Sequence, residues 1–349
     1  MHFSFNDTDK EKLISLFNQH EYNLDYLIYL KDIIWQNLSI CIDNNKNQTP
    51  FDVRKELINQ LDKKAPFPNT FVKNALSWEA NLLRIDAYET NPYLKALNGL
   101  SFSKDGWSLN SKVLKAFSLF PKEDEFMVGT NYTIKMNIGF FDKDYSYPSI
   151  SLYNQEWMSL NPYEIRTMEI PIQLAKGNVL TLGLGLGYYA YIAHLKEEVK
   201  EVHIVEMDLE LIKIFNEYLL PLFPHKEKVH IHRADAFYFV QNINDGDYDL
   251  IFSDLWHDVS DGVVSYLKLK KRFNDFKRTQ CTYWIEDAII TYLRLLVIGV
   301  MKDEFYQLDN DYDELQLFIK NRLKDYQLIS TYDLDSLLNI KGLGTLLLK

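Results

Sequence analysis

Short apolar runs and amphipathic segments alternate along residues 176 to 300. Apolar runs that begin the segments 178–195, 199–208, 228–240 and 248–258 are rich in Val, Ile and Leu and end at a glycine or a polar residue. Such runs are typical of buried parallel strands, whereas apolar residues that recur every three or four positions predict helices between them. TQCTYWIE at 279–286 predicts a fifth strand. The pattern therefore indicates a doubly wound α/β domain.

The pattern before this domain differs, so we expect three parts. Residues 1–120 read as a helical N-terminal domain, with Thr49-Pro50 as a helix start in which the hydroxyl caps and the proline occupies the first turn. Residues 121–170 are richer in β-forming residues and predict a small β-rich element. Residues 171–349 then form the Rossmann-like domain. The N-terminal helices are expected to serve as a cap or as an assembly surface, for example in a homo-oligomer.

Three glycines at alternate positions, Gly183, Gly185 and Gly187, follow the first strand of the α/β domain. Glycine permits a tight turn and lets a ligand lie against the backbone, so we predict a ligand at the carboxyl end of this strand. A dinucleotide fingerprint, G-x-G-x-x-G, would place its third glycine at Tyr188 in one register and at Ala190 in the other. Because alanine is tolerated there, both NAD and S-adenosylmethionine stay open at this stage.

Acidic residues end the following strands. Glu206 lies about twenty residues after the glycine loop, where a carboxylate can bind both ribose hydroxyls of an adenosine group. Asp235 and Ala236 follow the third strand, and Asp254 ends the fourth strand. Carboxyl ends of parallel strands meet at one edge of a sheet, so these residues should share one site.

The G-x-G-x-G loop and the four strand ends together resemble class I S-adenosylmethionine-dependent methyltransferases. This resemblance implies a Rossmann-like sheet of seven strands whose last pair is antiparallel, and YQLISTYD and GTLLLK near the C-terminus suit that pair. It also implies that Gly183, Gly185, Gly187 and Glu206 bind the cofactor and that Asp235-Ala236 contacts adenine.

Within this superfamily the chain looks most like the spermidine synthase branch, the aminopropyltransferases. The layout of residues 151–183 and the acids Asp254 and Asp258 after the fourth strand resemble that branch. The chain departs from it at Leu186, where the branch has an acid in the glycine loop. It departs again at Thr167 and Met168, where the E-x-x-Y-H-E helix of the branch has Tyr and His; Glu164 and Glu169 match that helix's two acids.

These departures remove two parts of polyamine chemistry, so the residues favour methyl transfer from S-adenosylmethionine to a small or cationic acceptor. Methyl transfer needs alignment and exclusion of water more than acid-base groups. Asp254, His257 and Asp258 are the candidate catalytic residues, because a carboxylate or imidazole there can take a proton from the acceptor. Two alternatives stay open: an aminopropyltransferase-like enzyme that uses decarboxylated S-adenosylmethionine, and a non-catalytic binding or assembly protein.

Composition and charge limit the partners and the cellular location that we expect for this protein. A formal net charge of −11 disfavours nucleic acid as a partner. The two cysteines, Cys41 and Cys281, lack metal-ligand or redox spacing, so we expect no metal site. The N-terminus lacks the pattern of a signal peptide, and the longest apolar run, at 288–301, contains Arg294 and is too short to span a bilayer. A cytoplasmic protein with a small-molecule substrate is the resulting expectation.

Overall fold

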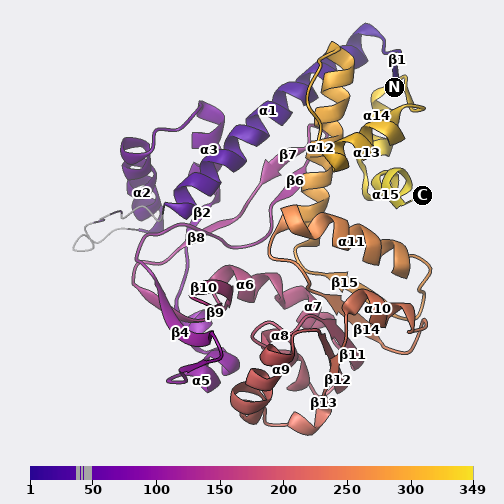
Figure 1. Cartoon of the computed structure of the whole chain (residues 1–349). Coiled ribbons are helices and arrows are strands. Elements are labelled where there is room, and N and C mark those ends of the chain that lie inside the picture. Colours follow the sequence, from indigo (N-terminus) through magenta and orange to yellow (C-terminus); the bar gives the residue numbers. More distant parts are fainter. Residues whose placement is uncertain (37–39, 41, 43–48, 349) are drawn as a thin grey trace.

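A five-stranded parallel sheet organises the C-terminal half of the computed structural model, which describes residues 1–36, 40, 42 and 49–348 (Figure 1). The strands lie in the order β13-β12-β11-β14-β15. Their bounds are β11 (Gly177–Leu182), β12 (Val199–Glu206), β13 (Val229–Arg233), β14 (Leu250–Ser253) and β15 (Gln280–Tyr283). Strand order therefore reverses between β11 and β14, and ligands of such sheets bind in the crevice at this reversal.

Helices connect these strands, as the alternating pattern predicts. They are α8 (Tyr188–His194), α9 (Leu209–Ile214) with the short helices η1 (Phe215–Leu219), η2 (Leu220–Leu222) and η3 (Lys226–Lys228), α10 (Ala236–Gln241) and α11 (Val259–Phe273). The long helix α12 (Glu286–Tyr306) follows the last strand, β15. Val179, Leu180 and Leu182 of β11 are fully buried, which explains why this strand reads as a continuous apolar run. The doubly wound α/β prediction is confirmed in this respect.

The expected antiparallel pair is wrong, since the described residues give the sheet five strands. Residues 344–348 lie in α15 (Ile340–Leu348), which follows α13 (Glu314–Leu323) and α14 (Thr331–Leu338). Leu343, Leu346 and Leu347 are buried, and this spacing fits one face of a helix. Of YQLISTYD, Gln327–Leu328 form β16, which pairs in parallel with β1 (His2–Phe3) and brings the two ends of the chain together (Figure 1). Lys349 lies outside the described residues.

The N-terminal part is less helical than expected. Its helices are α1 (Asp7–Trp35), α2 (Pro50–Lys64), α3 (Thr70–Glu79), α4 (Asp86–Glu89) and α5 (Pro92–Leu97). Thr49 caps α2 in a capping box with Asp52, as predicted. Residues 102–114, by contrast, form β3 (Phe102–Lys104) and β4 (Trp107–Leu114). Alternation of buried and exposed side chains at the start of β4, from Trp107 to Asn110, is the two-residue period of a strand.

Three small sheets complete the fold. The largest has the order β10-β9-β4-β3, with β9 (Tyr145–Leu152) and β10 (Gln155–Ser159), so it joins strands from both sides of the boundary predicted at residue 120. In the second sheet β8 (Ile138–Phe140) lies between β2 (Ala80–Leu82) and β5 (Phe120–Pro121), and in the third β6 (Phe126–Val128) pairs with β7 (Thr133–Lys135). Two short helices, α6 (Pro162–Thr167) and α7 (Glu169–Leu174), then lead into β11.

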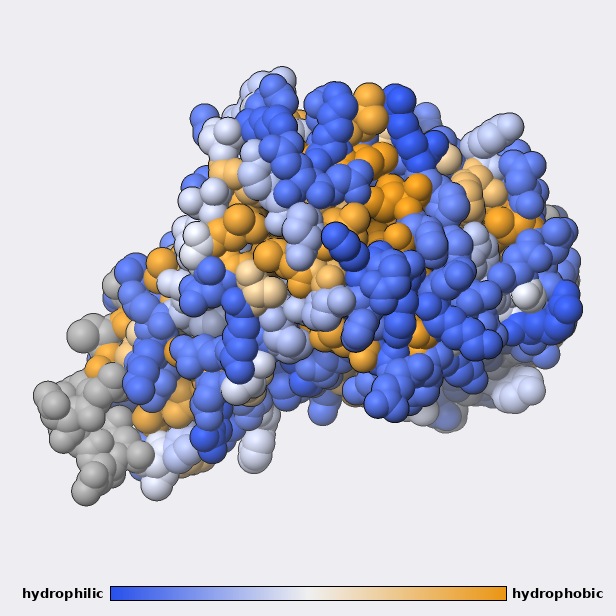
Figure 2. Space-filling model, turned by 90° about the horizontal axis from the view of Figure 1, so that it is seen from below, coloured by the Kyte–Doolittle hydropathy of each residue, from blue (hydrophilic) through white to orange (hydrophobic). Residues whose placement is uncertain are grey.

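The described residues form two hydrophobic cores. One surrounds the parallel sheet, and the other joins α1, α2 and α3 to the strands near residues 134–140, with Leu295 of α12 reaching into it. The surface seen from below is largely hydrophilic, with a band of hydrophobic residues across it (Figure 2). No helix in the described ranges is long and apolar enough to cross a membrane. Of the two cysteines, Cys41 lies outside the described residues.

Candidate functional site

The glycine loop between β11 and α8 has a backbone shape that glycine adopts readily. Gly183, Gly185 and Gly187 have φ angles of +101°, +50° and +76°, in the left-handed region. A Cβ atom at Gly183 would lie 2.0 Å from the carbonyl oxygen of Asp254, so no side chain fits there. The sequence prediction of a tight turn at the end of the first strand is confirmed.

A cavity of about 690 Å³ opens beside this loop, at the carboxyl ends of β11, β12, β13 and β14. This volume is in the usual range for small-molecule sites. Most of the residues predicted from the sequence line it: Gly183, Gly185, Glu206, Asp235, Ala236, Asp254 and His257. Gly187 and Asp258 are not among the lining residues. Gly187 instead begins α8, where an added Cβ would lie 2.6 Å from the ring of Phe215.

Glu206 joins the end of β12 to the glycine loop. Its Oε1 atom accepts the backbone N–H groups of Met207 and Asp208, each at 2.8 Å, and its Oε2 atom accepts the N–H of Leu184 at 3.3 Å. The carboxylate is partly buried and lines the cavity rather than pointing into bulk solvent. Oε2, with its single acceptor bond, keeps capacity to bind a ligand hydroxyl.

Asp235 and Ala236 lie where β13 gives way to α10. The Asp235 carboxylate caps this helix by accepting the N–H of Tyr238 at 2.8 Å, and it is exposed at the cavity. Ala236 is buried behind it. The position therefore combines a helix cap with a carboxylate that a ligand can reach.

Asp254 follows β14, next to β11, and its backbone N–H donates to the carbonyl of Leu182 at 2.9 Å. Burial raises the pKa of its carboxyl to about 7. Such a group changes between acid and base near neutral pH, which is the property that acid-base catalysis needs.

Glu164 reaches the same cavity from α6, which Asn161 caps. Burial, and then the charge of Asp254, raises the pKa of Glu164 well above its usual range. Burial, and then the charge of Glu125, raise the pKa of Asp124 to about 7, and Asp124 accepts a hydrogen bond from the hydroxyl of Tyr163 at 3.1 Å. The sequence analysis matched Glu164 to a motif but named neither acid as a site residue, because no strand end marks them.

The charge of the cavity lining is strongly one-sided. Six carboxylate side chains line it, namely Glu156, Glu164, Glu206, Asp208, Asp235 and Asp254, and the lining within the described chain includes no Lys or Arg. Low-dielectric walls that carry one sign of charge attract ligands of the opposite sign. The cavity is therefore built for a cation.

His257 and Asp258 lie at the rim. His257 is exposed, its ring meets Trp157 edge-on at 5.3 Å, and its Nδ1 lies 3.2 Å from the carboxylate of Asp261. Asp258 forms a capping box with Asp261 at the start of α11. Its carboxylate is thus occupied in capping a helix outside the cavity lining, which departs from its expected place beside Asp254.

The two departures from the spermidine synthase pattern also have structural consequences. Leu186 is fully buried, and its backbone N–H donates to the Sδ atom of Met158 at 3.1 Å, so Met158 lies on the glycine loop over Gly185. Thr167 accepts the indole N–H of Trp284 at 2.9 Å, and Trp284 lines the cavity. Uncharged side chains thus occupy both positions.

Comparisons with known proteins find one domain family and several solved structures that resemble this chain. The spermine/spermidine synthase domain family matches residues 170–292. Similar solved structures include a spermidine synthase from Thermotoga maritima (16% identity, 39% of this chain and 49% of that chain, TM-score 0.30). A probable spermidine synthase from Corynebacterium glutamicum ATCC 13032 gives 14% identity, 50% and 59% coverage and a TM-score of 0.31. A spermidine synthase in complex with the transition state analogue AdoDATO gives 13% identity, 44% and 58% coverage and a TM-score of 0.32.

The chain spans about half to three fifths of the length of these solved structures. No curated protein sequence matches it. The family match covers the glycine loop and all four strand ends that carry the predicted site. The resemblance expected from those residues is therefore confirmed over residues 170–292, which match the spermine/spermidine synthase domain family.

Proposed function

We propose that this protein is an aminopropyltransferase-like enzyme that moves an alkylamine group from decarboxylated S-adenosylmethionine to an amine acceptor. The observation that carries the proposal is the charge of the cavity lining. Among the described residues, this lining contains six carboxylates and no Lys or Arg. A donor with a sulfonium and an ammonium group, and an amine acceptor, are all cationic. The family match over residues 170–292 supports the same class of reaction.

The charge of the cavity also favours the decarboxylated donor over S-adenosylmethionine itself. The α-carboxylate of S-adenosylmethionine would enter a lining that offers no cationic side chain and would meet Asp254 and Glu164. Like charges at close range in a low-dielectric site disfavour binding. For the adenosine part, we assign the backbone at Gly183 and Gly185 to close contact, Glu206 to the ribose hydroxyls, and Asp235 with Ala236 to adenine.

The reaction needs one proton acceptor. The acceptor nitrogen forms a bond to the carbon next to the sulfonium, the carbon–sulfur bond breaks, and its electron pair neutralises the sulfur to give methylthioadenosine. The nitrogen loses one proton, and we assign Asp254 as the base that takes it, because it lines the cavity and its pKa is about 7. Glu164 lines the same cavity, and a cationic acceptor beside it favours the ionised form of its carboxyl, which then helps to hold the acceptor in line.

Methyl transfer is the second candidate, and one observation favours it. Leu186 is buried and uncharged at the loop position where the resemblance implies an acid for the donor amine. An enzyme that lacks this acid loses a partner for the aminopropyl group. The assay must therefore separate the two transfers.

The test offers both donors to the purified protein with a panel of diamines and polyamines. Chromatography that resolves methylthioadenosine from S-adenosylhomocysteine identifies which group moved. We expect methylthioadenosine from the decarboxylated donor only, and loss of this product in Asp254→Asn. Glu197→Gln, at an exposed acid outside the site, is the matched control. Release of S-adenosylhomocysteine would support methyl transfer, and absence of binding by either donor would contradict both candidates.

A further inference from the structure

Three histidines and a glutamate gather outside the cavity, on the edge of the parallel sheet. Glu201 and His203 are two residues apart on β12, and His230 and His232 are two residues apart on β13, the outermost strand. Alternate residues of a strand share one face, and the register pairs His203 with His230. The sequence analysis expected no metal site because it considered cysteine spacing; here strand pairing brings the ligands together.

The geometry of three of these side chains fits a small metal ion. His203 Nε2 lies 3.1 Å from one oxygen of Glu201, and His230 Nε2 lies 3.9 Å from the other. One ligand atom from each of the three residues lies within 4.8 Å of the other two. A tetrahedral ion with bonds near 2.1 Å holds its ligand atoms about 3.4 Å apart, so modest side-chain rotations would close the site.

His232 supplies the support that metal-binding histidines usually have. Its Nε2 atom lies 2.9 Å from Nδ1 of His203. If His203 carries its proton on Nδ1 and donates it to His232, its Nε2 lone pair is free to bind a metal. The ring of His232 is held in turn against Phe239 of α10 at 5.3 Å.

We propose that Glu201, His203 and His230 bind one divalent transition metal ion of the zinc class, with a water molecule as fourth ligand. Imidazole and carboxylate ligands suit Zn²⁺ and neighbouring transition metals rather than Mg²⁺. The side chains of Glu201 and His230 are 48% and 42% exposed, which leaves a path for the ion to enter. The ion would cross-link the edge strand β13 to β12, so the role is structural.

This site is independent of the proposed function. Glu201 and His230 lie toward the amino ends of their strands and His203 lies in the middle of β12, whereas the cavity lies at the carboxyl ends. Variants of one site therefore report on that site alone. Asp254→Asn should bind metal as the wild type does.

The test uses the full chain after removal of metal with a chelator. Zn²⁺ is added, unbound metal is removed by gel filtration, and elemental analysis gives the metal content; competition with a chromophoric chelator gives the affinity. We expect one Zn²⁺ per chain, a higher melting temperature with Zn²⁺ but not with Mg²⁺, and a visible Co²⁺ spectrum of tetrahedral type. His230→Ala and Glu201→Gln should weaken binding at least a hundredfold, and His232→Gln about tenfold.

The control variant is His225→Ala, which removes an exposed histidine outside the cluster and should bind Zn²⁺ like the wild type. Circular dichroism checks that each variant is folded. If His230→Ala does not fold, the Zn²⁺ affinity of the conservative variant Glu201→Gln tests the proposal instead. Equal Zn²⁺ affinity in the wild type, His230→Ala and Glu201→Gln would overturn the proposal. So would a wild-type protein that keeps no Zn²⁺ after gel filtration.

Discussion

Burial, and then the charge of Asp254 at the end of β14, raise the pKa of Glu164, which α6 brings into the same cavity as Asp254. Burial acts on both carboxyls in the same direction. Two acids that share a poorly solvated site hold a proton to higher pH than either would in water. A cation that enters the cavity relieves this repulsion. The two carboxyls therefore favour the cationic class of ligand that we propose.

The first prediction concerns the pH dependence of the reaction. Asp254 accepts a proton only when it is ionised, and its pKa is about 7. We therefore expect kcat/KM to rise with pH through about 7 and then to level off. Asp254→Asn should lower kcat/KM by about 10²- to 10⁴-fold and remove this limb of the profile. Wild-type kinetics in Asp254→Asn would show that Asp254 does not take the proton.

The free energy of unfolding should also depend on Asp254, but with the opposite dependence on pH from that of kcat/KM. The folded pKa of Asp254 is about 7, above the usual 3.8, so the folded state binds more protons than the unfolded state between about pH 4 and 7. Stability from this group is therefore lost as pH rises through that window. Asp254→Asn should stabilise the fold by roughly 2–4 kcal/mol at pH 8 and should have little effect at pH 3. Urea unfolding at both pH values measures the difference.

Glu206 should contribute mainly to nucleoside binding. Glu206→Gln keeps an acceptor for the loop N–H groups but removes the charge that strengthens bonds to ribose hydroxyls. We expect methylthioadenosine to bind at least tenfold more weakly in calorimetry, which corresponds to about 1.4 kcal/mol. Glu197→Gln serves as the control. Unchanged affinity in Glu206→Gln would place the ribose elsewhere.

Gly183 tests the glycine loop directly. Gly183→Ala would bring a Cβ atom to 2.0 Å from the Asp254 carbonyl oxygen at a φ angle of +101°. We expect a loss of about 3 kcal/mol or more in the free energy of unfolding, because both strain and a backbone clash act. Gly99→Ala is the matched control: its φ angle is +78° but no atom lies within 4 Å of the added Cβ. The control should cost about 1 kcal/mol, and equal losses would show that the clash is relieved.

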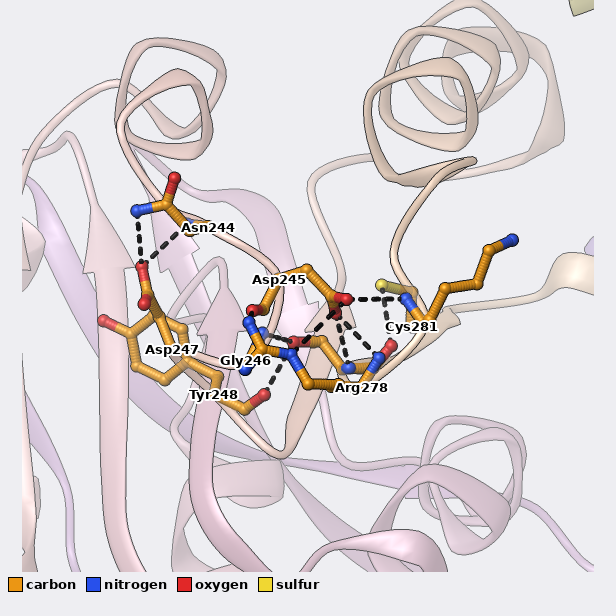
Figure 3. Close-up of polar contacts among 9 residues, drawn as sticks. Asn244, Asp245, Gly246, Asp247, Tyr248, Arg278 and Cys281 are labelled. Atoms are coloured by element: carbon orange, nitrogen blue, oxygen red, sulfur yellow. Dashed lines mark hydrogen bonds and ion pairs between the residues drawn. The ribbon is translucent and has the colours of Figure 1, made fainter.

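Asp245 ties the loop before β14 to the segment before β15 (Figure 3). Although desolvation opposes ionisation, backbone N–H donors from Lys277, Thr279 and Arg278 lower the pKa of Asp245 to about 2. A lowered pKa means that this stabilisation is present above about pH 4 and is lost as pH falls toward 2. Asp245→Asn should lower the melting temperature at pH 7 by a few degrees, and the gap to the wild type should close near pH 2. A gap that does not change with pH would contradict the assignment.

Local sequence patterns were enough to predict those features whose residues lie within one short stretch of the chain. The run Val179–Leu182 with Gly183, Gly185 and Gly187 predicted strand, turn and helix, and the acids Glu206, Asp235 and Asp254 were found because parallel strands bring their carboxyl ends to one edge. The apolar residues 344–348 misled, because a short apolar run fits a strand as well as a buried helix face. Packing of α15 against α11, α13 and α14 chose the helix.

By itself, therefore, the sequence determined the α/β domain, its glycine loop and most of the cavity's rim, since those depend on order along the chain. Only the tertiary structure decided that Glu164 lies in the same cavity as Asp254, that Asp258 caps a helix instead, and that His203 pairs with His230. Each of these relationships brings together different segments of the chain. The number of residues between two segments does not tell how far apart they lie in the folded protein. The pKa values of Glu164 and Asp254 likewise depend on burial, which exists only after the chain has packed.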